Sequence, residues 1–424
     1  MSAACAIDFG TSNSAIALVQ NGQAQLLDIE AGFTTMPTAV FYAVEGLSGF
    51  QEPEHRFGRA AIAAYVNGVE GRLMRSMKSI LGSTLAEQAT EVGGGHAVRY
   101  LDVIATYLRH LRNRARQATG LPPEQLVLGR PVFFVDGDAQ RDAAAQSALE
   151  TAARQVGFTD VRFQYEPIAA ALDYESTTTR EQRVLVADIG GGTSDFSLVR
   201  VGPQRRTRLD RRDDILANHG IHVAGTDFDR QIELSHLLPT CGFRARGPTG
   251  REVPSRVYFD LATWHLINTV YAPGRVAELR AMKAFYAEPR HHARLMTVLE
   301  DRLGHALTAM AENAKITVAQ ARTAHVGLER IEADLHVDIE ASALMTSIAG
   351  ELERIAQAAR TTAEMAGVAP SQVDAVYFTG GSTGLAALTD RIGAQFPSAR
   401  QVHGNRFASV AQGLGRYAAQ LFQR

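Results

Sequence analysis

The chain contains 424 residues, of which 46% are hydrophobic, and its formal net charge is −2. This length exceeds what one small core needs and predicts two lobes. The balanced charge gives no general electrostatic reason to bind nucleic acid or an anionic membrane. Apolar runs fall short of the ~20 residues that span a bilayer, and no leader segment precedes the first strand. The two cysteines, Cys5 and Cys241, lack metal-ligand spacing, so we expect a globular cytoplasmic protein in a reducing compartment.

The first predicted element is a β-hairpin with an aspartate near its tip. Residues Ala4–Leu18 read A-C-A-I-D-F-G-T-S-N-S-A-I-A-L, so an apolar strand ends close to Asp8 and a second strand resumes after a short turn. Glycine in such a turn allows backbone N–H groups to approach phosphate oxygens closely. The turn residues are Gly10, Thr11, Ser12 and Asn13. Asn21-Gly22 then predicts a tight turn into a third strand at 24–29.

The middle of the first half alternates between strands and helices. Residues 33–100 are less regular and predict a small inserted subdomain. A helix at 102–118 and a strand at 125–134 follow. A helix near 139–156, a short strand at 161–164 and a helix from Pro167 complete this half. The threonine run at 177–179 is expected to mark the crossing between the lobes.

A second aspartate-tipped hairpin opens the second half. Residues Val184–Val199 read V-L-V-A-D-I-G-G-G-T-S-D-F-S-L-V, with Asp188 before the glycines and Asp195 after them. The two carboxylates can hold a hydrated divalent cation or an attacking water. One such motif is equally compatible with a plain tight hairpin. Two in one chain favour a nucleotide held from both sides.

The rest of the second half contains a third glycine turn between long helical segments. The strand at 373–379 runs into Gly380, Gly381, Ser382, Thr383 and Gly384 before a helix. Residues 230–310 are mostly helical and predict a second inserted subdomain, 341–365 a long helix, and 407–422 a closing amphipathic helix. The five arginines of 205–212 favour a solvated loop over a partner-docking patch.

The three glycine turns resemble the two phosphate motifs and the adenosine motif of the actin-like ATPase superfamily, and more narrowly those of heat-shock protein 70 (DnaK-type) chaperones. Val127–Glu175, Ala224–Asp229 (A-G-T-D-F-D) and Ala311–Lys315 (A-E-N-A-K) resemble further segments of that family. The resemblance runs in order from Ile7 to about Gly413, so it covers nearly the whole chain.

The resemblance implies an α/β actin-like ATPase fold, a duplicated ribonuclease H-like fold of two lobes. Each lobe would have a central mixed sheet and an inserted subdomain, with the nucleotide in the cleft between the lobes. The expected division is 1–178 for lobe I, with 33–100 inserted, and 179–400 for lobe II, with 230–310 inserted. Residues 401–424 would form a closing helix that returns to lobe I.

The resemblance also implies roles for individual residues. The catalytic residues would be Lys78, Glu166, Asp188, Thr193 and Asp195. The nucleotide would contact Asp8, Gly10, Thr11, Ser12, Asn13, Gly190, Gly191, Gly192, Thr193, Gly225, Thr226, Asp227, Glu312, Lys315, Gly380, Gly381 and Ser382. Asp8, Asp188 and Asp195 would hold Mg²⁺, and a nearby K⁺, mostly through water. Lys78 and Lys315 are two of only three lysines among 43 basic residues, and a lysine is a more compact charge than an arginine.

Three positions depart from the family pattern around the adenine. Gly384 and Ile316 stand where members carry arginines, and Ala319 stands where a serine meets the adenine edge. The lost cation–π contact and hydrogen bond are worth ~1–2 kcal/mol, so ATP binding is expected to be weaker than in full-length chaperones. The chain also ends after the closing helix, and so resembles a short subfamily with the nucleotide-binding domain but no peptide-binding domain.

The expected function is therefore that of a chaperone-like ATPase. It would bind ATP or ADP and hydrolyse ATP to ADP and phosphate. It would act as a nucleotide-dependent switch on an unidentified protein partner or client, as a monomer or weak dimer, without nucleic acid or membrane.

Alternatives from other classes remain open at this point. A bacterial actin-like filament protein or a sugar kinase would share the fold, although filament proteins usually carry glutamate where Asp195 stands. A serine hydrolase would use Ser382 in the pattern G-x-S-x-G, with Asp390 and His403 downstream. That pattern leaves both aspartate hairpins unexplained.

Overall fold

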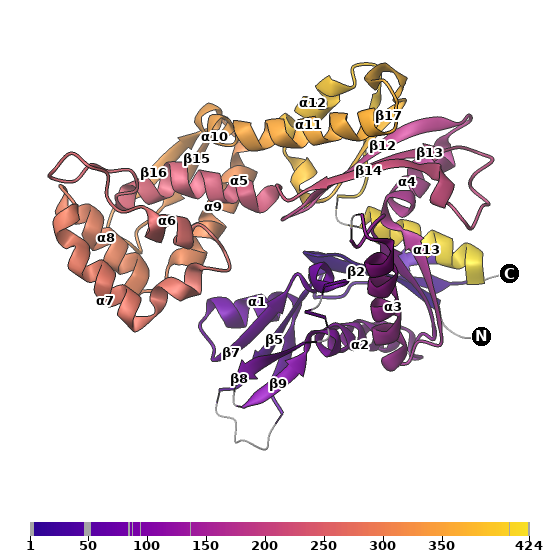
Figure 1. Ribbon diagram of the computed structural model, residues 1–424, viewed down its shortest axis with the longest axis horizontal. Coiled ribbons are helices and arrows are strands. Elements are labelled where there is room, and N and C mark those ends of the chain that lie inside the picture. The colour runs from indigo at the N-terminus through magenta and orange to yellow at the C-terminus, as the bar shows by residue number, and fades with distance from the viewer. Residues whose placement is uncertain are drawn as a thin grey trace.

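The computed structural model describes residues 4–45, 52–83, 85–86, 88–93, 95–135, 137–406 and 408–422. Two larger sheets organise the chain, one in each half (Figure 1). The first consists of β1 (Ala4–Phe9), β2 (Asn13–Gln20), β3 (Gln23–Leu26), β4 (Thr35–Pro37), β10 (Gln125–Arg130) and β11 (Asp160–Tyr165). The second consists of β12 (Gln182–Ile189), β13 (Ser194–Val201), β14 (Ile215–Ile221), β17 (Ala375–Thr379) and β18 (Arg400–His403).

The two sheets have the same topology. In the order β3-β2-β1-β10-β11, three antiparallel strands are followed by two strands that run parallel to β1, and β14-β13-β12-β17-β18 repeats this arrangement around β12. In each sheet, the aspartate-tipped hairpin supplies the central strand and its antiparallel neighbour. The hairpins therefore occupy equivalent places in the two halves of the molecule.

Helices cover both faces of the first sheet. α2 (Tyr100–Thr119) and α3 (Ala139–Gln155) pack with one face of β1 and β10 in a common apolar core. α4 (Glu166–Thr177) and α13 (Ser409–Phe422) lie between the two sheets (Figure 1), where they share a core with apolar residues of both. The two halves are thus joined by continuous apolar packing behind the hairpins.

The largest core belongs to the second half. It includes α5 (Gly225–Ile232), α9 (Gly304–Val318), α11 (Ala349–Met365) and α12 (Ala386–Gln395), and it extends into a helical segment that contains α6 (Arg256–Leu261), α7 (Pro273–Ala281) and α8 (Pro289–Glu300). A separate hairpin of β15 (Thr323–Gly327) and β16 (His336–Glu340) leads into α10 (Ala341–Ser347).

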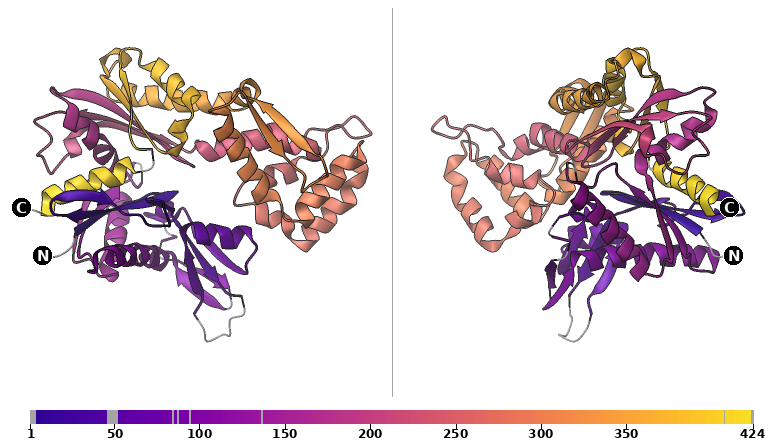
Figure 2. Two further views of the ribbon diagram at one scale, coloured as in Figure 1. Left: turned by 180° about the vertical axis from the view of Figure 1, so that it is seen from behind. Right: turned by 45° about the vertical axis from the view of Figure 1, so that its right-hand side comes forward.

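The segment between β4 and α2 is more regular than expected. It contains a three-stranded sheet of β5 (Ala39–Ala43), β6 (Glu54–Phe57) and β7 (Gly71–Arg75), the helix α1 (Gly58–Val66), and a hairpin of β8 (Ala89–Gly93) and β9 (His96–Arg99). This segment and the helical one extend from the same side of the molecule (Figure 2). They touch where the Tyr65 ring stacks on Trp264, with ring centroids 5.0 Å apart, and the Arg75 guanidinium lies 4.2 Å from a Trp264 ring centroid.

Three sequence predictions need correction. The strand predicted at 125–134 ends at Arg130, because Pro131 has no N–H to donate to a ladder. The long helix predicted at 341–365 is two helices that break at Ile348. The closing helix begins at Ser409, and Phe407, where it was predicted to start, lies outside the described residues.

The arginine-rich segment 205–212, which was predicted to be a solvated loop, is solvated only in part. The Arg211 guanidinium is 3% exposed and donates to the Glu175 carboxylate, 2.9 Å away, while Arg206 donates to the Glu175 carbonyl at 3.0 Å. Arg205 pairs with the buried Asp214. Arg205 and Arg211 are therefore committed to internal ion pairs and Arg206 to backbone carbonyls, whereas Arg208 and Arg212 are exposed.

Two further sequence expectations concern cysteine and membrane. Cys5 and Cys241 are unpaired and buried, and burial raises the pKa of the Cys5 thiol to about 12. In the parts of the chain that the structure describes, no helix combines the length and apolar character needed to cross a bilayer.

A buried carboxyl group, Glu233, predicts how stability depends on pH. Its side chain is fully buried and accepts a hydrogen bond from Thr308 at 3.0 Å, while its Oε1 has no hydrogen-bond partner. Burial raises the pKa of Glu233 to about 8 from an ordinary 4.5. Between these values the folded chain keeps a proton that the unfolded chain loses, so this group lowers the free energy of unfolding as pH rises.

We expect Glu233→Gln, which cannot ionise, to be more stable than the natural chain by over ~1 kcal/mol near pH 8. The gain should shrink towards pH 5. Urea unfolding of the two proteins at several pH values measures the gain in stability and its decrease towards pH 5. Parallel stability profiles for the two proteins would show that Glu233 does not titrate in this range.

Candidate functional site

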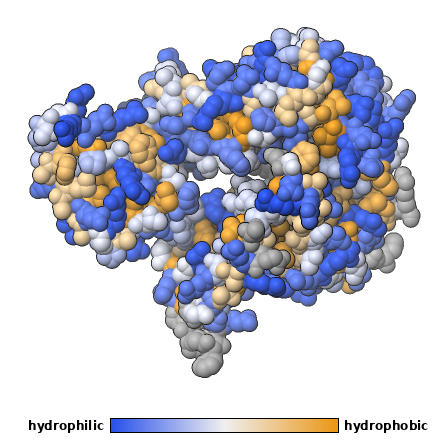
Figure 3. All heavy atoms as spheres, in the orientation of Figure 1, coloured by the Kyte–Doolittle hydropathy of each residue, from blue (hydrophilic) through white to orange (hydrophobic). Residues whose placement is uncertain are grey.

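The tips of the two aspartate hairpins meet in space. A Cβ added to Gly191, on the β12–β13 turn, would lie 3.4 Å from the Ser12 hydroxyl on the β1–β2 turn. Asp188 and Asp195 are direct cross-strand partners at the end of their hairpin. In space-filling view a small opening lies between the two halves of the molecule, which meet beside it (Figure 3). The structure thus brings together turns that lie about half the chain apart in sequence.

The glycine turns of the second half interlock through their backbones. The Gly191 carbonyl accepts from the Thr226 N–H at 2.7 Å and from the Thr226 hydroxyl at 2.8 Å, and the Gly190 carbonyl accepts from the Ser382 hydroxyl at 2.6 Å. Gly380 has a φ of +87° and lies against the Ile189 backbone, where a Cβ would be 2.3 Å from the carbonyl oxygen. Only glycine fits this close approach in the left-handed region.

Lys78 and Glu166 form an ion pair inside this site. Lys78 lies on a 3₁₀ turn, Met77–Ile80, and Glu166 is the first residue of α4. The Lys78 Nζ lies 2.5 Å from Glu166 Oε1, and only 9% of the lysine side chain is exposed. Burial by itself would lower the pKa of Lys78. The negative charges of Glu166 and Asp8 outweigh this effect, so the pKa of Lys78 is raised. The lysine therefore stays protonated among the carboxylates.

The aspartates of the two hairpins repel each other's charge. Burial, and then the charge on Glu166, raise the pKa of Asp8 to about 8, even though Lys78 opposes the rise. Burial, and then the charge on Asp195, raise the pKa of Asp188 to about 7. Asp195 is exposed, yet desolvation by the surrounding protein still raises the pKa of its carboxyl group, against a hydrogen bond from Thr193.

The three aspartates suit a cation that they would bind partly through water molecules. The oxygens of Asp8, Asp188 and Asp195 do not come within 4.8 Å of one another as a set, which is too far apart for common direct ligation. Mg²⁺ usually keeps several of its water ligands. These residues therefore fit a hydrated divalent ion, which would neutralise negative charge at this point.

The segments expected to contact a nucleoside lie on α5 and α9. Lys315 on α9 pairs with Asp229, its Nζ 2.6 Å from Oδ1, and its Nζ lies 3.3 Å from the Gly225 carbonyl. Glu312, one turn earlier, is exposed. Asp227 is engaged within its own helix, because its carboxylate accepts from the Ala224 N–H at 2.9 Å. Sequence pattern did not predict that Asp229 is the partner of Lys315.

A family model described as Hsp70 protein matches residues 4–240. This chain belongs to the Hsp70 family. It has the nucleotide-binding domain of that family with the actin-like ATPase fold, which confirms the expectation from the sequence. The filament-protein, sugar-kinase and serine-hydrolase alternatives are not favoured.

Curated relatives agree with this assignment. The chaperone protein HscA of Klebsiella pneumoniae subsp. pneumoniae is 26% identical over 415 residues, which cover 93% of this chain and 54% of that protein. HscA of Pectobacterium carotovorum is 27% identical over 406 residues, with the same two shares. The chaperone protein dnaK of Cyanidioschyzon merolae is 30% identical over 248 residues, 53% of this chain and 37% of that protein. The chain spans about half the length of the HscA relatives.

An arginine that sequence comparison did not single out lies beside Gly384. The Arg406 Nη1 is 2.8 Å from where a Cβ on Gly384 would be. Gly384 is the position at which the Hsp70 resemblance leads one to expect an arginine. Ile316 is 52% exposed on α9. No sequence signal pointed to Arg406, because it lies 22 residues away from Gly384 on the loop after β18.

The residues of the serine-hydrolase alternative are engaged elsewhere. The Ser382 hydroxyl donates to the Gly190 carbonyl, and His403 stacks on Phe378, with ring centroids 5.2 Å apart.

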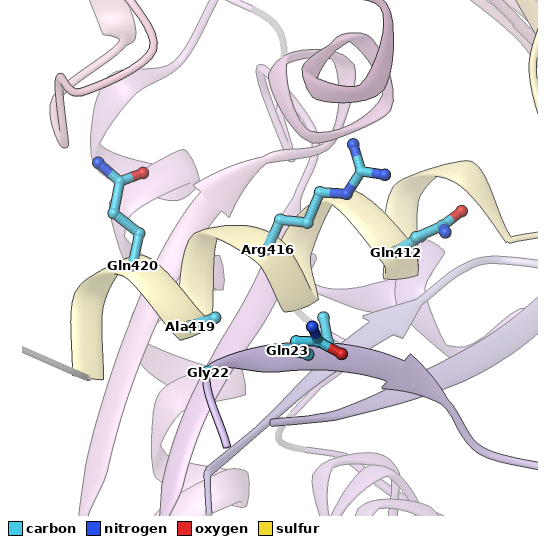
Figure 4. Close-up of a pocket in the computed structure, with 7 residues that line it drawn as sticks. Gly22, Gln23, Gln412, Arg416, Ala419 and Gln420 are labelled. Carbon is cyan, nitrogen blue, oxygen red and sulfur yellow. The ribbon is translucent and has the colours of Figure 1, made fainter. Parts of the chain in front are cut away.

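The structure also has a cavity away from the aspartate hairpins. A cavity of about 500 Å³ lies between the β2–β3 turn and α13 and is lined by Gly22, Gln23, Ala24, Gln412, Arg416, Ala419 and Gln420 (Figure 4). It lies at the opposite end of β2 from Gly10–Asn13.

Proposed function

We propose that this Hsp70-family chain binds ATP between its two lobes and hydrolyses it to ADP and phosphate. One observation carries the proposal: the two aspartate-tipped hairpins meet at Ser12 and Gly191, with the Lys78–Glu166 pair beside the same carboxylates. An anion with a bound cation fits such a site better than a neutral ligand does. The glycine backbones offer N–H groups to the anion, and the carboxylates offer charge to the cation.

Each residue has a proposed part in the reaction. The turns Gly10–Asn13 and Gly190–Thr193 hold the phosphates from opposite sides. Glu166 orients the attacking water, and Lys78 compensates the charge that develops on the γ-phosphate, because phosphoryl transfer depends mainly on positioning and charge stabilisation. Mg²⁺, held through water by Asp8, Asp188 and Asp195, would neutralise phosphate charge when bound, and K⁺ is proposed to lie nearby. Thr193 orients Asp195.

The nucleoside is proposed to lie further into the second lobe. Gly225, Thr226 and Asp227 approach from the N-terminus of α5. Glu312 and Lys315 approach from α9. Gly380, Gly381 and Ser382 form the floor beneath it. The interlocked hydrogen bonds between these turns support their acting as one binding surface.

We propose the lobe boundaries that the sequence predicted. Residues 1–178 form lobe I, with 33–100 inserted, residues 179–400 form lobe II, with 230–310 inserted, and 401–424 return to lobe I. The contacts of α13 with β1, β2, β3 and α4 support this division. A cytoplasmic location is proposed from the two unpaired cysteines. We also propose that the chain recognises a protein partner or client in one nucleotide state. Its proposed form is a monomer or a weak dimer.

The single tryptophan allows a direct test of nucleotide binding. Trp264 lies in lobe II and stacks on Tyr65 of lobe I, so a change in the angle between the lobes alters its surroundings. We expect ATP with Mg²⁺ to change Trp264 fluorescence in a saturable way and to release or absorb heat in calorimetry. Absence of binding by calorimetry, whatever the fluorescence does, would overturn the proposal.

Arg406 provides a second prediction. If its guanidinium lies over the base in place of an arginine at position 384, Arg406→Ala should weaken ATP binding by about 0.5–2 kcal/mol. Arg208→Ala, which removes an exposed arginine from the loop before β14, is the matched control and should leave affinity unchanged. Calorimetric titration of both variants decides the point. Equal affinities would mean that Arg406 does not contact the nucleotide.

A further inference from the structure

The small hairpin of lobe II carries metal-binding side chains on its solvent face. In the antiparallel pair β15–β16, His325 lies opposite Asp338, and Gly327 lies opposite His336. Side chains alternate between the faces of a strand, so His325, His336 and Asp338 share one face. All three are exposed, whereas Ala324 and Ile339 on the other face are buried in the lobe II core.

The three side chains are close enough to hold one ion. His325 Nδ1 lies 2.7 Å from Asp338 Oδ1, and the two imidazole rings have centroids 4.9 Å apart. One ligand atom from each of the three residues lies within 4.8 Å of the others. Among the residues that the structure describes, this is the one cluster of histidine, cysteine, aspartate or glutamate with that property.

Both imidazoles are already oriented by oxygen atoms. His336 Nδ1 lies 3.1 Å from the Asp334 carbonyl oxygen, which only accepts hydrogen bonds, so this nitrogen carries the proton. His325 Nδ1 is similarly placed against the Asp338 carboxylate. Metal-bound histidines usually donate their second nitrogen to a carboxylate or a carbonyl. The Nε2 atoms of both rings are thereby left as acceptors with a lone pair for a metal.

A second carboxylate reaches the same face through a gap left by glycine. A Cβ on Gly327 would lie 2.5 Å from Glu329 Oε2. Because Gly327 is the cross-strand neighbour of His336, the glycine makes room for this carboxylate next to the second histidine. The face therefore offers two imidazoles and two carboxylates.

We propose that His325, His336 and Asp338, with Glu329 beside them, form a binding site for a divalent transition-metal ion such as Zn²⁺. Mixed imidazole and carboxylate ligands suit Zn²⁺, Ni²⁺ or Cu²⁺ better than Mg²⁺ or Ca²⁺, which prefer oxygen ligands alone. The histidines supply nitrogen ligands, and the carboxylates supply charge and oxygen atoms. The ion would link β15 to β16, because each strand contributes one histidine.

Zinc titration of the full chain, with Mg²⁺ in excess, tests the proposal. Calorimetry should show one zinc ion per chain, and His325→Ala and His336→Ala should each weaken binding at least about tenfold. His265→Ala, which removes an exposed histidine outside the hairpin, should bind zinc as the natural chain does. Unchanged binding in both hairpin variants, or displacement of zinc by Mg²⁺, would overturn the proposal.

A structural readout separates this site from zinc bound elsewhere. Zinc should slow amide hydrogen exchange in 323–327 and 336–340 of the natural chain and leave those amides unaffected in His325→Ala. The three side chains are exposed, so the alanine variants should unfold in urea as the natural chain does. Slowing that persists in His325→Ala would show that the ion binds outside the hairpin.

Discussion

Replacement of Lys78 by alanine is expected to lower the rate of ATP hydrolysis by about 10²–10³-fold and to leave ATP binding largely intact. The Lys78 Nζ contacts Glu166 and is influenced by Asp8 and Asp195. It is thus a buried positive charge at the point where the two hairpins meet. A charge that compensates the transferring phosphoryl group acts mainly in the transition state, so its loss should affect turnover more than affinity. Single-turnover hydrolysis together with calorimetric ATP binding measures the two effects separately.

Two variants make the Lys78 result specific. Lys283→Ala removes an exposed lysine far along the chain and should hydrolyse ATP at the natural rate. Lys78→Arg keeps the charge but replaces a compact ammonium with a planar fork, and we expect it to recover little of the activity. Hydrolysis by Lys78→Ala at the natural rate would remove Lys78 from the mechanism, and full recovery in Lys78→Arg would show that only net charge matters.

Replacement of Gly413 by alanine is expected to have the largest effect on stability. Gly413 lies on α13 where this helix crosses α4, and an added Cβ would overlap the Ala169 carbonyl oxygen and lie 2.5 Å from its carbonyl carbon. Those atoms belong to a helix backbone and cannot rotate away. Overpacking of this kind typically costs about 1–3 kcal/mol and sometimes more. We expect a lower free energy of unfolding in urea and, because α13 shares a core with both sheets, weaker nucleotide binding.

Gly350 provides the matched control for this substitution. It is also a helical glycine, at the start of α11, but it is exposed and a Cβ there would meet nothing within 4 Å. Alanine is the better helix former, so Gly350→Ala should be neutral or stabilising by at most about 1 kcal/mol. Equal stability of the two variants would show that α13 can shift away from α4 without loss.

The amino-acid sequence by itself determined the hairpins and turns of the site. An apolar strand before Asp8 or Asp188, glycines after it and alternation beyond are local patterns, because strand periodicity and the demand for glycine at a tight turn act within a few residues. Prediction was weaker where local signals were ambiguous. Pro131 ended a strand sooner than the apolar run suggested, and the helix at 341–365 broke at Ile348 although the nearby Gly350 lies inside the second helix.

The tertiary structure alone decided which distant side chains meet. Lys78 and Glu166 are 88 residues apart, Arg406 reaches Gly384 from another loop, and Arg211 is buried against Glu175 in a segment whose composition favoured a solvated loop. Such contacts depend on how sheets and helices pack over the whole chain. Burial of a charged side chain costs desolvation free energy, and only a close partner of opposite charge offsets that cost. Sequence alone therefore cannot predict whether a charged residue is buried or exposed until its partners are known.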